Sequence, residues 1–130
     1  MVDGCVIVKL LNFLFPSLIK FDRSEIPSWD EHHHPWNILS GKNDLKSQII
    51  RLLEDGEEYY AHPTAKIADS VKIEEPTYIG PGVTIRHGAY LRGGSWICEG
   101  ALVGNSSEIK NSILLPGAKA PHFNYVGDSI

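Results

Sequence analysis

Large apolar residues recur at every sixth position through the second half of this 130-residue chain. Each follows, by two positions, a small or β-branched residue such as Ala65, Thr77 or Ser107. An α-helix repeats every 3.6 residues, and an alternating strand ends after about five or six. A period of six that continues over about fifty residues predicts a chain that turns regularly and stacks on itself. The large residues of the series are Ile67, Ile73, Ile79, Ile85, Leu91, Ile97, Val103, Ile109 and Leu115.

Three hexads make one triangular coil of about 18 residues, which is the repeat of a parallel β-helix. The large residue of each hexad points into the prism, and successive coils pair their backbones at about 4.8 Å. The alternative is a β-sandwich with regular strands, but sandwich strands do not keep a six-residue register through their turns. We therefore predict a mainly β fold, a parallel β-helix of hexapeptide repeats, with three to four coils over residues 65–130.

A short amphipathic helix is predicted before the repeats. Asn43 or Asp44 can cap its start, and Gly56 can close its end. We expect this helix to pack on the first coil and cover its open edge, because uncovered strand edges invite association. Its apolar stripe comprises Leu45, Ile49, Leu52 and Leu53, whereas Lys46, Gln48, Arg51 and Glu54 lie away from that stripe.

The chain thus divides into an N-terminal arm over 1–60, with one capping helix at about 43–55, and a β-helix over 61–130. We expect residues 5–20 to form a strand or extended arm and residues 21–41 to be irregular. The run from Glu31 through three histidines, His32-His33-His34, lacks the spacing of zinc sites, and we predict a solvated loop and no metal.

The composition excludes several classes of protein. Twelve basic against sixteen acidic residues give a net charge of −4, which argues against nucleic-acid binding and polybasic membrane binding. Cys5 and Cys98 form no disulfide framework. The apolar start is interrupted by Lys9 and preceded by Asp3, so it fits neither a membrane span nor a signal peptide. We expect a cytoplasmic protein with reduced thiols, in which Cys98 is outward-facing and exposed.

Arg92 and Lys110 are 18 residues apart, and each follows an inward residue. We expect them to form a stacked cationic pair on the surface of the prism, with Asp128 one coil further. Two adjacent cations repel unless an anion lies near them, and a sugar phosphate would suit a guanidinium beside an ammonium. The alternatives are two solvated charges or a pairing with Glu108.

The repeat breaks where Pro121 replaces a large apolar residue. We expect residues 119–125 to leave the pattern and project as a loop, since loops carry sites. His122 is a candidate general base, and Tyr125 and Asn124 are candidates for hydrogen bonds to sugar hydroxyls. The alternative for His122 is a packed loop histidine.

Residues 100–105, GALVGN, and 119–128, KAPHFNYVGD, carry a resemblance to a known family. With Arg92 and Lys110, they resemble the left-handed β-helix of the bacterial bifunctional N-acetylglucosamine-1-phosphate uridyltransferase and glucosamine-1-phosphate N-acetyltransferase. They are equally similar to archaeal sugar-1-phosphate nucleotidyltransferases with such a tail. The resemblance covers residues 60–130, and the spacing of Lys119, His122 and Tyr125 is more specific than the hexad alone.

The resemblance implies a sugar-nucleotide-pathway transferase that moves an acetyl group from acetyl coenzyme A to an amino sugar phosphate, a step towards UDP-N-acetylglucosamine. By the same resemblance, Arg92 and Lys110 hold the phosphate, His122 deprotonates the amine, and Tyr125 orients the substrate. It also implies a homotrimer with each site between neighbouring prisms.

Two departures from the family remain. The first sixty residues are too short for a uridyltransferase domain and lack its glycine-rich loop, so pyrophosphorylase activity is not expected. The family's helix continues beyond the position of Ile130, so we expect either a fragment of a longer β-helix or a missing acetyl coenzyme A site. The alternative function is a non-catalytic trimeric β-helix module that assembles or regulates a separate nucleotidyltransferase.

Overall fold

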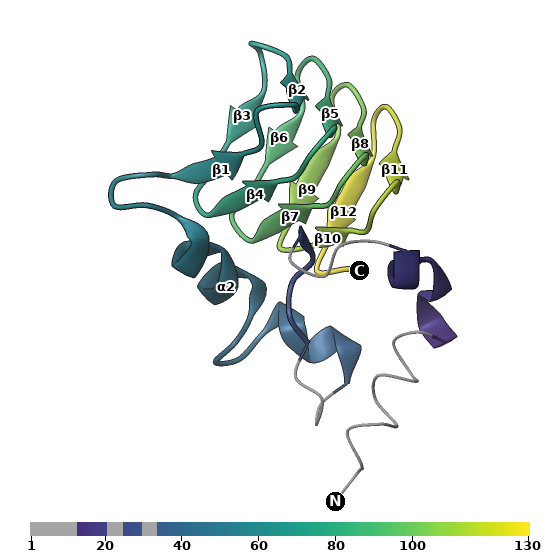
Figure 1. The fold of residues 1–130 in the computed structure, drawn as a ribbon. Coiled ribbons are helices and arrows are strands. Elements are labelled where there is room, and N and C mark those ends of the chain that lie inside the picture. Colours follow the sequence, from purple (N-terminus) through teal and green to yellow (C-terminus); the bar gives the residue numbers. More distant parts are fainter. Residues whose placement is uncertain (1–12, 21–24, 30–33) are drawn as a thin grey trace, which may run out of the picture.

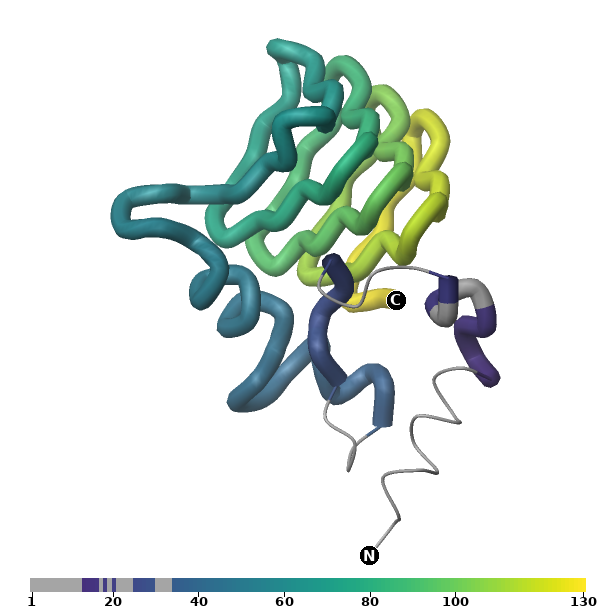
Figure 2. The backbone as a smooth tube through the Cα atoms, viewed as in Figure 1, coloured from purple at the N-terminus to yellow at the C-terminus, as the bar shows by residue number. Residues whose placement is uncertain are grey.

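The computed structural model of the chain describes residues 13–20, 25–29 and 34–130. Its main body is a three-sided parallel β-helix, which confirms the fold expected from the hexads, and the stacked coils are visible in Figures 1 and 2. Each side is a four-stranded parallel sheet. Sheet A contains β1 (Tyr59–Ala61), β4 (Thr77–Ile79), β7 (Ser95–Ile97) and β10 (Ile113–Leu114). Sheet B contains β2 (Lys66–Ile67), β5 (Thr84–Ile85), β8 (Leu102–Val103) and β11 (Lys119–Ala120). Sheet C contains β3 (Lys72–Ile73), β6 (Tyr90–Leu91), β9 (Glu108–Lys110) and β12 (Tyr125–Gly127).

The prism is filled by one large side chain from each short strand. Ile79, Ile85 and Leu91, which come from three successive hexads and one from each sheet, are all buried within it. Small residues such as Ala89 and Ala101 occupy the positions two before the large ones and are also buried. The alternation of large and small residues packs the three corners around a continuous apolar axis.

The coil shortens by one residue after Ile109, which the hexad series did not predict. Tyr59 pairs with Thr77 and Thr77 with Ser95, 18 residues apart, whereas Ile113 pairs with Trp96, 17 residues apart. The missing residue comes from the turn at Asn111, whose φ of 44° lies in the left-handed region that asparagine tolerates.

Two predictions are corrected by this change of register. Leu114, and not Leu115, is the inward residue of the next hexad, and Leu115 packs on the outside of the prism. The expected break at Pro121 is also wrong. Ala120 and Val126 follow Leu114 at regular six-residue steps, and β11 and β12 continue the sheets without a projecting loop.

The arm lies on the outer face of sheet A (Figure 1). Its helix α2 (Leu45–Leu52) is capped by Asp44, whose Oδ1 accepts a hydrogen bond of 2.9 Å from the backbone N–H of Ser47. Leu45 and Ile49 are fully buried in one apolar cluster with Tyr78, Trp96 and Ile113. The helix therefore covers a face of the prism. The expectation that it would cover the open edge of the first coil is not met.

Gln48 is buried, contrary to its expected place on the polar side of α2. Its Nε2 donates hydrogen bonds to the carbonyl oxygens of Ser28 at 2.9 Å and Asn43 at 3.0 Å. Its Oε1 accepts one from the backbone N–H of Ser28 at 2.8 Å. The segment around Ser28 covers this flank of the helix, while Leu52, expected in the apolar stripe, remains 51% exposed.

The described residues of the arm include the 3₁₀ helices η1 (Pro16–Lys20) and η3 (Pro35–Leu39). The prediction of a strand or extended arm over 5–20 is wrong for residues 16–20, which form η1. Residues 5–12 lie outside the described part. Within the region expected to be irregular, η3 is regular, and residues 21–24 and 30–33 are not described. Of the histidine run, only His34 is described. It is exposed, and its ring stacks on Trp36 at 4.4 Å between centroids.

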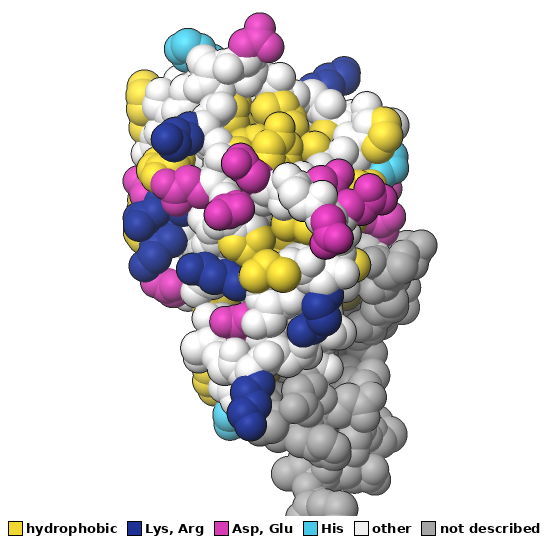
Figure 3. Space-filling model, turned by 90° about the vertical axis from the view of Figure 1, so that its left-hand side faces the viewer, with side chains coloured by type: hydrophobic (Ala, Val, Ile, Leu, Met, Phe, Trp, Pro, Cys, Tyr) yellow, Lys and Arg dark blue, Asp and Glu magenta, His cyan; other side chains and the backbone are white. Residues whose placement is uncertain are grey.

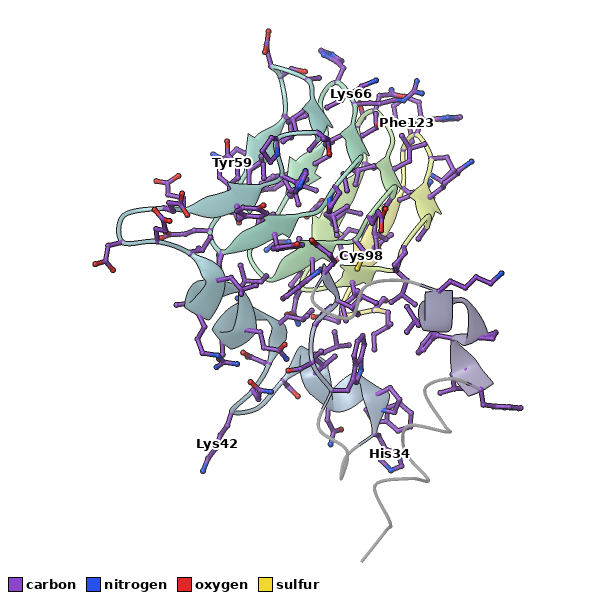
Figure 4. The ribbon with its side chains drawn as sticks, in the orientation of Figure 1. His34, Lys42, Tyr59, Lys66, Cys98 and Phe123 are labelled. Carbon is purple, nitrogen blue, oxygen red and sulfur yellow. The ribbon has the colours of Figure 1, made fainter. Side chains whose placement is uncertain are left out.

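The arm also buries Cys98, which was expected to be exposed. The position is outward, as predicted, but the arm covers it (Figure 4). Beside it, Glu25 accepts a hydrogen bond from the hydroxyl of Tyr78 through its carboxylate and one of 3.1 Å from Nε1 of Trp96 through its carbonyl oxygen. Burial, and then the bond to Glu25, raise the pKa of Tyr78. Among the described residues, no helix has the length and apolarity needed to cross a bilayer.

Candidate functional site

The outer face of sheet C presents the charged residues singled out in the sequence. Leu91 and Ile109 face the axis, so the residues on either side of each point outward. The backbone N–H of Arg92 donates a hydrogen bond of 2.8 Å to the carbonyl oxygen of Ile109. This bond places Arg92 beside Lys110 on the next coil. The expected stacking of these two cations is present in the structure.

Arg92 and Lys110 line a pocket of about 440 Å³ at the corner where sheet C meets sheet A. One wall consists of the ends of sheet C strands, including Gly93 and Asn111. The opposite wall comes from the arm, through residues 39–41, Asp44 and Lys46. The pocket therefore lies between the β-helix and the arm, which a reading of the repeats alone could not show.

Each of the two cations has a carboxylate neighbour. Arg92 Nη1 lies 3.0 Å from Glu108 Oε1, and this hydrogen bond raises the pKa of the guanidinium. Lys110 Nζ lies 3.3 Å from Asp128 Oδ2. The pairing of Arg92 with Glu108, one of the alternatives left open by the sequence, is thus present. These contacts relieve the repulsion between the stacked cations without any ligand.

Asn111 ties together three parts of the pocket. Its Nδ2 donates to Asp128 Oδ1 at 2.9 Å and to the carbonyl oxygen of Leu39 in the arm at 3.1 Å. The bond from Asn111, followed by the one from Lys110, lowers the pKa of the Asp128 carboxyl. The residue at which the coil shortens is therefore also the residue that holds the arm to the corner.

The hydroxyl of Tyr90 donates a hydrogen bond to Glu74, which also lines the pocket. This bond raises the pKa of Tyr90. Glu74 and Glu108 lie on the coils before and after Tyr90. Glu74 accepts a hydrogen bond from Tyr90, and Glu108 accepts one from Arg92. Arg92 and Lys110 therefore belong to a hydrogen-bonded network on the outer face of sheet C that includes Glu74, Glu108 and Asp128.

Tyr125 lies on the same face, one coil beyond Glu108. Its side chain is 60% exposed and folds back over Gly127, where a Cβ would overlap the phenol ring and oxygen. Gly127 pairs with Lys110, so the tyrosine hydroxyl points towards the Lys110 end of the sheet. The structure thus brings Arg92, Lys110 and Tyr125 to one face.

His122 and Asn124 lie at the other end of sheet C. His122 is exposed and makes an edge contact with the ring of Phe123, at 5.5 Å between centroids. Phe123 is on the side of the prism away from the arm (Figure 4). Asn124 Nδ2 donates to the carbonyl oxygens of Pro121 at 3.1 Å and His122 at 3.3 Å, so its amide shapes this turn. Phe123 is next to His122, and Gly127 pairs with Lys110. At roughly 3.3 Å per residue, the backbone between Phe123 and Gly127 spans about 13 Å, which separates His122 from the Lys110 end of the sheet.

The sequence reasoning missed Lys46 and Asn111 as parts of the pocket. Asn111 had a local signal, because Ile109 and Leu114 are only five residues apart, although Leu115 hid this spacing by keeping an apolar residue at six. Lys46 had no signal of its own, since its position depends on how the arm docks. Acidic and basic side chains are interspersed on the face shown in Figure 3 and form no basic stripe. Within the described residues, no group of three or more metal-ligating side chains is present.

Comparison with known proteins identifies relatives of the chain. No protein-family model matches it. The chain is 36% identical over 114 residues to the bifunctional protein GlmU of Methanococcus maripaludis strain S2, covering 78% of this chain and 27% of the relative. It is 34% identical over 120 residues to GlmU of Methanocaldococcus jannaschii, with the same coverage. The chain contains a GlmU-like β-helix domain.

A further relative carries a more explicit name. The bifunctional sugar-1-phosphate nucleotidylyltransferase/acetyltransferase of Sulfurisphaera tokodaii is 34% identical over 119 residues, with 78% of this chain and 28% of the relative covered. The chain thus spans little more than a quarter of the length of these GlmU relatives. The relationship concerns one region of these transferases.

Proposed function

We propose that this GlmU-like domain binds an amino sugar phosphate at the corner pocket and takes part in acetyl transfer from acetyl coenzyme A to its amine. The observation that carries the proposal is the placement of Arg92 and Lys110 on adjacent coils in one pocket. The relative from S. tokodaii, named as an acetyltransferase, supports the choice of reaction. Acylation of an amino sugar phosphate belongs to the synthesis of nucleotide sugars.

The phosphate would be bound by the guanidinium of Arg92 in a bidentate manner and by the ammonium of Lys110 as a point charge. Glu108 and Asp128 hold these cations in place until the phosphate competes for them. The hydroxyl of Tyr125 points along the same face and can hydrogen-bond a sugar hydroxyl. Asn124 contributes by shaping the turn that presents His122.

His122 is proposed as the general base, as the family resemblance implies. It accepts a proton from the sugar amine while the nitrogen attacks the thioester carbonyl. The new C–N bond forms, the C–S bond breaks, and the coenzyme A thiolate leaves and is protonated. In glucosamine 1-phosphate the amine and the phosphate are on adjacent carbon atoms, whereas His122 and the pocket are at opposite ends of sheet C. The His122 that reaches an amine bound in the pocket would therefore come from a neighbouring copy of the chain.

A homotrimer with sites between neighbouring prisms fits this arrangement. The arm covers the outer face of sheet A, so contacts between copies would use the outer faces of sheets B and C. A second copy against sheet C would enclose the exposed strip between the pocket and His122 and exclude water from it.

The test is isothermal titration with glucosamine 1-phosphate. Arg92→Ala is expected to weaken binding at least about tenfold, because it removes a charge-assisted contact to the phosphate. Arg86→Ala is the matched control, since Arg86 is exposed and follows the inward Ile85 on sheet B as Arg92 follows Leu91 on sheet C. The proposal is overturned if the wild type releases no heat, or if both variants bind equally.

A non-catalytic trimeric module is the second candidate, and the ion pairs of Arg92 and Lys110 with carboxylates of their own chain favour it. Such a module would assemble or regulate a separate nucleotidyltransferase and would not bind acetyl coenzyme A. Thermal unfolding with acetyl coenzyme A separates the two functions, because a ligand at 100 times its dissociation constant adds about 2.7 kcal/mol of stability. Unchanged unfolding at high ligand concentration supports the module.

A further inference from the structure

The arm supplies one complete wall of the pocket that contains Arg92 and Lys110. Residues 39–41, Asp44 and Lys46 form this wall. It is fixed at two points. Asn111 binds the carbonyl oxygen of Leu39 at 3.1 Å, and the buried Leu45 and Ile49 anchor α2 on sheet A. The wall is therefore held rigidly by packing and a hydrogen bond.

Lys46 is the cation of this wall. Leu45 faces sheet A, so the next residue on the helix is turned about 100° away, towards the corner. Lys46 is exposed and lines the same pocket as the two cations of sheet C. Among the described residues, Lys46 forms no ion pair, in contrast to Arg92 and Lys110.

Gly94 provides the space for this lysine. A Cβ on Gly94 would lie 3.1 Å from Cγ of Lys46 and 2.8 Å from Oδ1 of Asn111. Gly94 also has a φ of 85°, which other residues rarely adopt. The absence of a side chain at this corner lets the stem of Lys46 pass close to the backbone, beside Asn111.

The charges around the pocket explain what a third cation would do. Arg92 and Lys110 are paired with Glu108 and Asp128, and Asp44, Glu74 and Glu75 add negative charge to the lining. Without Lys46, a phosphate near Arg92 and Lys110 would therefore meet an excess of negative charge. A lysine in the first turn of a helix is also unfavourable for the helix itself, because the N-terminus already carries partial positive charge. An anion in the pocket would offset the repulsion between Lys46 and the helix N-terminus, and Lys46 would supply positive charge that the other wall lacks.

We propose that Lys46 of the arm is a third phosphate-binding residue and that the arm is part of the substrate site. This inference rests on the proposed binding of an amino sugar phosphate in the corner pocket. The phosphate is held between Lys46 on one wall and Arg92 and Lys110 on the other. The arm thereby selects phosphorylated over unphosphorylated amino sugars.

The experiment compares the wild type with variants of Lys46, Lys42 and Arg92 by titration with glucosamine 1-phosphate and with inorganic phosphate. Lys46→Met is expected to weaken binding of both probes about tenfold, because one charge-assisted contact is lost. Lys46→Arg keeps the charge and is expected to bind within about twofold of the wild type. Lys42→Met is the control, since Lys42 lies on the arm four residues earlier and projects away from the β-helix (Figure 4).

The outcomes separate this inference from the proposed function. If the wild type binds neither probe, both fail. If Arg92→Ala loses binding while Lys46→Met binds like the wild type, the proposed function stands and the role of Lys46 is refuted. Equal losses in Lys46→Met and Lys46→Arg would also refute it, because the charge would then be irrelevant. Thermal unfolding of each variant, with Lys46→Gln as a second neutral replacement, shows that the fold is retained.

Discussion

Cys98 occupies an outward position on sheet A, next to the inward Ile97, and is nevertheless fully buried. The residues that cover it come from the arm, which is remote in sequence. Burial, and then the charge of Glu25, raise the pKa of the Cys98 thiol. Since the thiolate is the reactive species, this cysteine is chemically inert while the arm stays docked.

We predict that Cys98 is not alkylated in the native protein. In a Cys5→Ser background, which leaves Cys98 as the one cysteine of the chain, iodoacetamide is expected to react only after denaturant is added. Mass spectrometry of the labelled protein measures the modified fraction over time. Native labelling as fast as that of the unfolded chain would show that the arm does not cover this position.

At the scale of elements, α2 is a short helix that packs on the outer face of sheet A through its apolar side. Eight residues are too few for a stable isolated helix, so its stability depends on packing. Its buried side packs on aromatic side chains of sheet A, among which the ring centroids of Tyr78 and Trp96 are 4.4 Å apart. The arm is therefore attached to the prism mainly by apolar contacts. Hydrogen bonds from Tyr78 and Trp96 to Glu25, and from Asn111 to Leu39, add to this attachment.

Ile49 and Ile50 provide a matched test of this attachment. Ile49 is fully buried and Ile50 is 59% exposed, although they are identical neighbours on one helix. Ile49→Ala is expected to lower the free energy of unfolding by about 2–4 kcal/mol, because it leaves a cavity. Ile50→Ala is expected to change it by less than about 0.5 kcal/mol. Urea titration followed by circular dichroism measures both. Similar losses in the two variants would contradict the docking of α2.

At the scale of the whole molecule, the number of residues per coil decides which side chains reach the axis. The shortening at Asn111 shifts every later residue by one position relative to an unbroken 18-residue coil. Ala120 and Val126 thereby become interior residues, and the turn containing His122 joins two regular strands. The last coil remains a full member of the prism.

Leu114 and Leu115 test the register directly. Leu114 lies in the core of the prism, whereas Leu115 is half-buried on its outside. Leu114→Ala is expected to cost about 2–4 kcal/mol of stability and Leu115→Ala about half as much or less, since the cost follows burial and the cavity left behind. Denaturant midpoints of the two variants give the comparison. A larger loss of stability for Leu115→Ala than for Leu114→Ala would show that Leu115 is the inward residue and that the six-residue register is unbroken.

The hexads alone determined the three-sided parallel β-helix, its inward residues as far as Ile109, and the stacking of Arg92 on Lys110. These features follow from a local period that repeats in every coil, so each residue's neighbours are known from counting. Only the tertiary structure decided the register after Asn111, the burial of Cys98 and Gln48, and the pocket wall that carries Lys46. These features depend on one shortened turn and on where the non-repeating arm docks. Both are set by packing between segments distant in sequence, and a local repeat in the sequence carries no information about such packing.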